Sequence, residues 1–342
     1  MGLGTAQTGV IVADKWIPQQ WQDEAIATYM AKTVMRNLVS TMTHTKHKGD
    51  SIIFPKPARG DATAKAVNTQ VTLIADTATD ITLTINKHYE YSKLYEDIAD
   101  MMALNGMKKF YTKDAGYALA RRVDAELFKL MAGMNGGSIA GATNLFETGV
   151  IGGDGSTAFA GASSGNGTAL TDVGLRTAIQ TLEDQDVNSA ELNFVVPPTV
   201  IKTLRGIARF TEQAFRGDGD TLKTGRVGNL YGVEVFASSL CPWIHCNSTT
   251  GTQSVNFSGT TLSGAAVVDE FGFTVDHSAG TETKYRACAL LHEDALMMAE
   301  MQAIRVQQQY KQEYLGYLVT ADTIFGVVEM RDYAALSVIV PS

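Results

Sequence analysis

The sequence predicts an α+β fold in which one long helix and an extended two-stranded ribbon accompany an inserted α/β-type domain. Three observations support this prediction. Residues 107–134 keep the apolar period of a helix, residues 49–91 change to a period of two, and residues 169–298 interleave short apolar strands with helices. The predicted order is an N-terminal arm, the ribbon, the long helix, the inserted domain and a set of closing strands.

Residues 107–134 predict a helix about 42 Å long, at a rise of roughly 1.5 Å per residue. At 100° per residue, one broad half of its surface is apolar and the other half is charged. The apolar half contains Tyr117, Leu119, Ala120, Val123, Leu127, Phe128, Leu130, Met131 and Met134, and the charged half contains Asp114, Arg121, Arg122, Glu126 and Lys129. Because this apolar half is wider than a coiled-coil seam, we expect the helix to lie along a sheet. The helix is expected to end where glycines follow, at Gly133, Gly136 and Gly137.

The segments before this helix have few apolar partners close by in sequence. Residues 1–13 are small and polar, and residues 19–40 predict a helix whose apolar face must dock on a distant surface or on another chain. Strand-like runs at 51–57, 71–75 and 81–91 predict a ribbon with both faces rather polar. A solitary two-stranded ribbon is marginally stable in water, so we expect a neighbouring molecule to support it.

The segments after the long helix predict a loop, a domain and a closing sheet. Residues 133–167 hold eleven glycines and predict a surface loop. Within 169–298, Thr171 predicts a helix N-cap and Pro198 a helical first turn. The expected strands of this domain are 193–198, 231–240, 265–275 and 284–291. Strand-like runs at 302–310 and within 321–342 are expected to return beneath the long helix.

Composition excludes several classes of protein. With 45% hydrophobic and 19% charged residues the chain has material for a sizeable core. A net charge of −8 argues against a protein that grips phosphates through a basic face. Cys241, Cys246 and Cys288 are an odd number of cysteines, which indicates free thiols in a reducing cytosol. No apolar run approaches the roughly 18 residues that span a bilayer, so no membrane partner is expected.

The order of these segments resembles the HK97-type coat proteins of tailed double-stranded DNA bacteriophages. The similar strings are GDSIIFPKP (49–57) and ITLTINKHYEY (81–91) for the extended loop, GYALARRVDAELFKLMAG (116–133) for the spine helix, NFVVPPTVIKTL (193–204) and GRVGNLYGVEVFASSLCP (225–242) for the axial domain, and CALLHEDALMMAE (288–300) and TIFGVVEMRDYAALSVIV (323–340) for the peripheral domain. No single string is a strict signature, and their shared order carries the resemblance.

The resemblance implies an HK97-like fold with a particular division of the chain. Its parts would be an N-terminal arm (1–48), an extended β-ribbon loop (49–91), a peripheral domain (92–168) with its spine helix, an inserted axial domain (169–298) and peripheral closing strands (299–342). It further implies a homo-oligomer of pentamers and hexamers in an icosahedral shell, formed in the host bacterial cytoplasm and kept as the virion capsid. The implied partners are a portal protein, a possible decoration protein and packaged DNA held by non-specific proximity.

Some members of that family begin with a long cleavable scaffolding segment, whereas this sequence starts almost at the arm. We therefore expect a separately encoded scaffolding protein, or none. An acidic shell lining would let the duplex slide during packaging. Two alternatives stay open: an encapsulin-like compartment with cargo enzyme inside, and a cytosolic α/β enzyme with an unrecognised site.

No catalytic residue, cofactor or metal site is expected. Cys241, His245 and Cys246 lack a fourth zinc ligand and the usual spacing. The expected contacts between chains are Trp16, Trp21, Tyr29, Phe54, Lys56, Arg59, Lys65, Tyr89 and Tyr91. Lys56 or Lys65 could form an isopeptide cross-link, as in some relatives, but nothing favours either, and no cross-link is expected. Asp124 falls in the apolar half of the long helix, so it is either marginally exposed or a buried carboxylate bonded to a backbone donor or an arginine.

Overall fold

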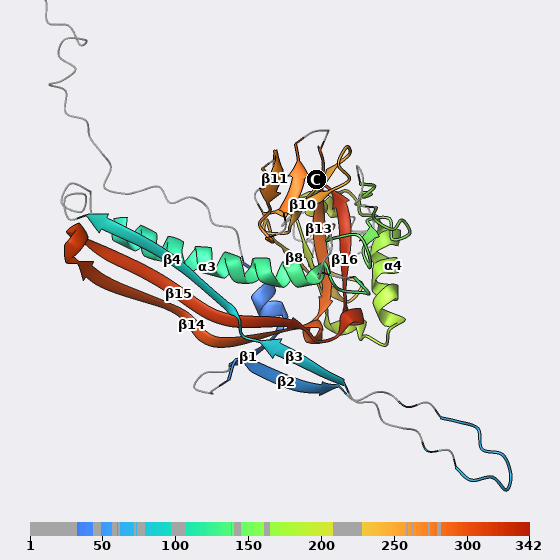
Figure 1. Ribbon diagram of the computed structural model, residues 1–342. Coiled ribbons are helices and arrows are strands. Elements are labelled where there is room, and N and C mark those ends of the chain that lie inside the picture. The colour runs from blue at the N-terminus through green and yellow to red at the C-terminus, as the bar shows by residue number, and fades with distance from the viewer. Residues whose placement is uncertain are drawn as a thin grey trace, which may run out of the picture.

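The computed structural model describes most of the chain in ranges separated by gaps. These ranges are 33–43, 49–56, 60, 62–71, 73, 79–96, 107–137, 139, 145–160, 165–207, 228–257, 259–260, 263–272, 274–278 and 282–342. Figure 1 shows an elongated part, in which helix α3 (Met107–Met131) lies along a narrow sheet, and a compact part at one end of that helix. Within the described ranges, no helix is both long enough and apolar enough to cross a membrane.

The narrow sheet has four strands in the order β1-β14-β15-β4. Their bounds are Ser40–Thr43 for β1, Lys87–Glu96 for β4, Leu296–Lys311 for β14 and Gly316–Glu329 for β15. β14 and β15 form a long antiparallel hairpin, β4 pairs antiparallel with β15, and β1 pairs parallel with β14. The prediction that 302–310 and 321–329 return beneath the long helix is therefore confirmed.

Apolar side chains attach α3 to both parts of the molecule. Ala115 and Leu119 pack against Ala321 of β15, and Val123, Leu127 and Phe128 enter the core shared with the compact part. Each large side chain buried in this way stabilises the fold by about 1.5–3 kcal/mol. The helix ends three residues before its predicted limit. Glu126, which helical phase assigns to the charged half, is instead buried, because cations surround its carboxylate as described below.

The ribbon consists of β2 (Ser51–Lys56) paired antiparallel with β3 (Thr79–Thr84), and we call these two strands the ribbon root. Ile52, Phe54 and Leu83 of the root pack on Met297, Met301, Ile324 and Val328 of the narrow sheet. The expectation that only a neighbour supports the ribbon is therefore wrong for the root. The predicted strand 81–91 divides at residues 85–86, so that its second half becomes part of β4. Residues 71 and 73, in a predicted third run, lie outside any strand.

The compact part contains an eight-stranded sheet in the order β10-β9-β13-β6-β8-β7, with β16 paired to β13 and β5. Its strands are β5 (Ile151–Gly152), β6 (Leu192–Val196), β7 (Asn229–Leu230), β8 (Val233–Ala237), β9 (Trp243–Asn247), β10 (Gln253–Asn256), β13 (Glu282–His292) and β16 (Ala335–Pro341). A small separate sheet is formed by β11 (Gly264–Val268) and β12 (Thr274–His277).

Helices cover the eight-stranded sheet from both sides. Along β13, Cys288 and Leu290 enter the core that contains α4 (Asp172–Glu183) and α5 (Pro198–Gly206), whereas Ala289 and Leu291 enter the core that contains α3. This alternation follows from the period of two in a strand. The predicted cap is confirmed, because the Thr171 hydroxyl accepts a hydrogen bond from the Gly174 N–H at 3.0 Å. Pro198 opens α5, as predicted.

Two predicted segments fold differently. Residues 335–341 were expected beneath the long helix but pair with β13 in the compact sheet, because they are apolar on both faces and only that sheet is covered on both. Residues 19–40 were expected to form one helix. Their described part contains only the short 3-10 helix η2 (Met35–Leu38) followed by β1, because the backbone before η2 binds a side chain of α3.

Candidate assembly surfaces

Asp124 of α3 holds the described end of the N-terminal arm. The side chain is 1% exposed, and its carboxylate accepts hydrogen bonds from the backbone N–H groups of Val34 at 2.8 Å, Met35 at 3.4 Å and Arg36 at 3.3 Å. These donors begin a 3-10 helix and have no partner within it, so the carboxylate acts as a cap supplied by a distant residue. Burial raises the pKa of Asp124, although the three N–H groups act in the opposite direction. Of the two alternatives the sequence left open, the structure shows the buried carboxylate.

Glu126, half a turn further along α3, joins the helix to β4. Its carboxylate lies 2.7 Å from Lys87 Nζ and 2.8 Å from Arg122 Nη2, and it accepts a hydrogen bond from the Tyr89 hydroxyl at 2.6 Å. Burial acts to raise the pKa of Glu126, but the hydrogen bonds from Lys87 and Tyr89 and the nearby positive charges hold it below its ordinary value. The charge of Glu126 is therefore stabilised in the folded chain.

Replacing Glu126 with glutamine tests this network. Since the folded-state pKa is lowered, the stabilisation is present above the unfolded pKa of about 4.3 and is lost as the pH falls through the folded value. Glu126→Gln should reduce the free energy of unfolding by about 1–3 kcal/mol at pH 7 and by much less at pH 3, as measured by urea denaturation. The control Glu300→Gln, whose partner Arg36 is largely exposed, should change stability by less than about 1 kcal/mol. An equal loss at both pH values would contradict this account.

Basic residues on the same stretch of α3 hold the compact part. Arg122 Nη1 donates to the Glu270 carbonyl at 3.0 Å, Lys129 Nζ donates to the Phe271 carbonyl at 2.7 Å, and Arg121 lies 3.5 Å from the Glu270 carboxylate. Two turns of the helix thus bind the arm, β4 and the compact part, which fixes where each extension leaves the molecule.

The ribbon beyond its root exposes apolar side chains. The described residues of this ribbon loop (60, 62–71 and 73) are all exposed, with Val67 at 89% and Leu73 at 90%. In Figure 1 the loop extends away from every other element. Lys65 lies on it and is exposed. Apolar side chains held this far into water mark a surface that a partner covers.

The hairpin tip, residues 310–317 at the joined ends of β14 and β15, is a second exposed apolar surface. Tyr310 and Tyr317 face each other across the strands with ring centroids 5.1 Å apart. Beyond them the 3-10 helix η5 (Gln312–Tyr314) ends in Leu315, whose φ of 45° lies in the left-handed region. Tyr314 and Leu315 are 62% and 66% exposed.

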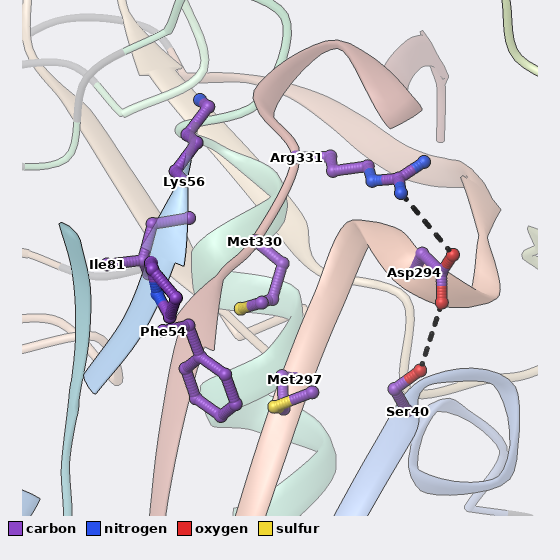
Figure 2. A pocket seen from close by; sticks show the side chains of 9 residues that line it. Ser40, Phe54, Lys56, Ile81, Asp294, Met297, Met330 and Arg331 are labelled. Carbon is purple, nitrogen blue, oxygen red and sulfur yellow. Dashed lines mark hydrogen bonds and ion pairs between the residues drawn. The ribbon is translucent and has the colours of Figure 1, made fainter. Parts of the chain in front are cut away.

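A groove of about 340 Å³ opens at the ribbon root, and we call it the root groove (Figure 2). Its lining residues are Ser40, Phe54, Pro55, Lys56, Ile81, Asp294, Met297, Met330 and Arg331. The Asp294 carboxylate lies 4.0 Å from Arg331 Nη2 and accepts a hydrogen bond from the Ser40 hydroxyl at 3.4 Å. The groove therefore combines an apolar interior with a charged rim.

The carboxyl group of Glu329 lies between the root groove and the end of α3. Burial and the neighbouring Asp332 raise the pKa of Glu329 to about 7, whereas Lys56 acts to lower it. The Gly136 N–H donates to both oxygens of the Asp332 carboxylate, at 3.0 and 3.1 Å. Glu329 therefore titrates near neutral pH.

Glu329→Gln should show the opposite pH dependence to Glu126→Gln. A raised folded-state pKa contributes stability below the unfolded value near 4.3, and this contribution is lost as the pH rises through about 7. The glutamine variant should match the parent chain at pH 4.5 and exceed it by about 1–2 kcal/mol at pH 8, once solvent screening is allowed for. Urea denaturation at both pH values measures this. The exposed control Glu234→Gln should change the free energy of unfolding by the same amount at both pH values. A Glu329→Gln effect that does not grow with pH would refute the expectation.

The structure places the predicted contact residues in three groups. Phe54 and Lys56 line the root groove and Lys65 lies on the ribbon loop. Tyr89 and Tyr91 contact α3 of their own chain, because the Tyr91 hydroxyl donates to Asp114 at 2.9 Å just as the Tyr89 hydroxyl donates to Glu126. The remaining candidates lie outside the described residues: Trp16, Trp21, Tyr29 and Arg59.

The cysteine and histidine candidates are buried in the compact part. Cys241, Cys246 and Cys288 are free thiols, and burial raises the pKa of Cys241 and of Cys246 to about 12. The ring nitrogens of His245 lie 3.2 Å from Glu282 and 3.3 Å from Asn256. Burial lowers the pKa of His245, although its partner Glu282 acts to raise it. His245 thus binds Glu282 and Asn256, and the thiols are held in their unreactive form.

Comparisons with known proteins agree with an assembly protein. A profile of the family described as "Phage capsid protein" matches residues 13–335. No match was found among curated protein sequences. Among solved structures, a protein of Mycobacterium phage Che8 has 18% identity and a TM-score of 0.64 over 94% of this chain and 97% of its own. The capsid of cyanophage P-SCSP1u has 16% identity and a TM-score of 0.65 over 97% and 94%.

The head structure of Helicobacter pylori bacteriophage KHP40 is similar over 99% of each chain, with 11% identity and a TM-score of 0.63. These likenesses confirm the predicted HK97-like fold. The profile match covers almost the whole chain and agrees with a fold built around exposed apolar extensions. The chain belongs to the phage capsid protein family and is a major capsid protein that forms a shell.

Proposed function

We propose that copies of this chain assemble as pentamers and hexamers into an icosahedral shell around the double-stranded DNA genome of a phage. The observation that carries this proposal is the ribbon loop, whose exposed apolar residues have no counterpart in the described part of their own chain. Equivalent positions in a closed symmetric shell let one surface be covered many times by the same partner.

In this proposal the segments have separate roles. The arm (1–48) and the extended loop (49–91) reach neighbouring subunits. The peripheral domain (92–168 and 299–342) forms the wall between capsomers, and the axial domain (169–298) gathers around the local symmetry axis. Phe54, Lys56 and Lys65 are the proposed contacts that remain accessible in the described chain. β5 and β16 join the compact sheet although they lie outside 169–298, and the first residues of β14 pair in the narrow sheet although they lie inside it.

The chain itself performs no catalysis in this proposal and uses no cofactor. Its partners are a separately encoded scaffolding protein, a portal protein and a possible decoration protein, with assembly in the host bacterial cytoplasm. The packaged duplex is held by proximity, because a chain of net charge −8 offers little attraction to phosphate.

Electron microscopy of the purified protein tests the proposal. Expressed with its scaffold, or alone, the full chain should give closed shells, and shells from infected cells should protect DNA from nuclease. Enclosed cargo protein in place of DNA would indicate an encapsulin-like compartment, and a small discrete oligomer would refute a shell.

Val71→Ser combined with Leu73→Ser in the ribbon loop should lower shell yield at least tenfold, with the thermal unfolding temperature unchanged. The matched control is Val268→Ser, another exposed valine, in the compact part.

A further inference from the structure

The hairpin tip exposes apolar side chains beside a carboxylate, and the root groove has an apolar interior with cations at its rim. We propose that the hairpin tip of one copy docks into the root groove of a second copy, with Tyr314 and Leu315 entering the groove and Glu313 at its charged rim. This inference rests on the proposed assembly of identical chains and adds the residues that one contact uses.

The groove provides an apolar interior and cations at its rim. Phe54 and Ile81 from the ribbon root, Met297 at the start of β14 and Met330 directly after β15 approach a common space (Figure 2). Methionine side chains are flexible and polarisable, so they adapt to an inserted side chain. The lining residues include two cations, Lys56 and Arg331, and one carboxylate, Asp294, and the half-buried Glu329 lies near Lys56 outside the lining. In the described chain Lys56 makes no ion pair, and the pair of Arg331 with Asp294 is long and exposed.

The tip provides the complementary groups. Glu313, Tyr314 and Leu315 are consecutive and exposed, and no ion pair of Glu313 occurs among the described residues. Leu315 adopts a left-handed backbone conformation that is strained for a non-glycine residue. Gly316 lies next to it and could adopt that conformation at little cost. The exposure of this apolar side chain and the strain of its backbone both cost free energy. Together they indicate a contact that offsets these two costs.

The occupant must come from another copy. The groove contains Met297 at the start of β14, whereas the tip follows Lys311 at its end, a separation of roughly 45 Å at about 3.3 Å per residue. Figure 1 shows the tip and the ribbon root at different ends of the narrow sheet. Because the two surfaces differ, each copy uses its tip on one neighbour and its groove on another. Such head-to-tail contacts generate closed rings when the rotation between copies closes, as the pentamers and hexamers of the proposed shell require.

Cysteine cross-linking in assembled particles tests the contact. The double variant Leu315→Cys with Met330→Cys, treated with a mild oxidant, should form a ladder of covalently joined chains on a denaturing gel. Each single variant should give no ladder, because the three natural cysteines are buried. If the parent chain gives no shells at all, the proposed function fails. If shells form from the double variant without a ladder, only the docking proposal fails.

A photoreactive phenylalanine at position 330 identifies the occupant directly. Irradiated shells should yield a cross-linked peptide that contains residues 312–316 of a second chain. Capture of the arm, the ribbon loop or a scaffolding protein, or no capture, would overturn the proposal.

Leu315→Gly should raise the protein concentration needed for assembly at least tenfold while the unfolding temperature stays equal or rises. A fall in the unfolding temperature with unchanged assembly would make Leu315 a structural residue of its own hairpin.

Charge exchange provides an independent measurement. Glu313→Lys should raise the assembly concentration about threefold, as expected for an exposed ion pair. Combining it with Lys56→Glu in the same chain should recover most of that loss. Glu234→Lys, an exposed glutamate on β8, is the matched control. Equal effects of Glu313→Lys and Glu234→Lys, or no recovery in the combined variant, would contradict the assigned contact.

Discussion

Asp124→Ala is expected to lower the free energy of unfolding by about 3–5 kcal/mol. The change removes a buried carboxylate and leaves the backbone N–H groups of Val34, Met35 and Arg36 without a partner. Urea denaturation of the unassembled chain measures the loss. Because the arm then loses its anchor on α3, shell yield should fall more steeply than stability.

Asp114→Ala is the matched control, since it alters the same helix and removes a single bond to the Tyr91 hydroxyl. We expect it to cost no more than about 1.5 kcal/mol. Asp124→Asn keeps the shape but presents an NH₂ group to N–H donors, so it should rescue only part of the loss. Full stability in the asparagine variant would show that size, and not hydrogen bonding, is what position 124 requires.

Gly326→Ala is expected to destabilise the chain by about 2–3 kcal/mol, although alanine is normally the better strand residue. A Cβ at this position would lie 2.5 Å from the Thr84 carbonyl oxygen, 2.9 Å from Leu83 Cδ2 and 3.0 Å from Ile85 Cα. Two of these atoms belong to the backbone and cannot move without lifting the ribbon root from the narrow sheet. Thermal unfolding, together with protease cleavage of the ribbon, measures the effect.

Gly116→Ala provides the contrast, because nothing lies within 4 Å of a Cβ at that position in α3. Alanine should there stabilise the helix by about 0.5–1 kcal/mol. A Gly326→Ala variant that unfolds like the parent chain and resists protease equally would show that the root can shift at no cost.

Much of the fold follows from periodicity in the sequence. The half-apolar pattern of 107–134 predicts a helix on a sheet, and Thr171 and Pro198 mark helix starts that the structure reproduces. Patterns fail where partners are remote. Residues 81–91 alternate without a break, yet they divide between the root and β4, because packing on β15 decides where the chain turns. Residues 335–341 join the compact sheet because β13 is buried on both faces.

The candidate site was less predictable. Asp124 can be identified from the sequence, because a charged residue on the apolar half of a helix is rare. Glu126 gives no such signal, since its phase is polar and only the approach of Lys87 and Arg122 makes it buried. The hairpin tip was missed because its strain lies in the φ angle of Leu315, which neighbouring residue types do not reveal. Tyr89 is predicted as a contact between chains, and the sequence does not reveal that its hydroxyl donates a hydrogen bond to Glu126.

Asp124, Glu126 and Lys129 lie within six positions of one another on α3, and each fastens a different region of the molecule. Tension applied to any one extension therefore converges on the same short piece of backbone. These amides should exchange with deuterated solvent more slowly than any others in the elongated half. Forces that act on several regions of the subunit at once therefore cannot bend those regions independently of one another.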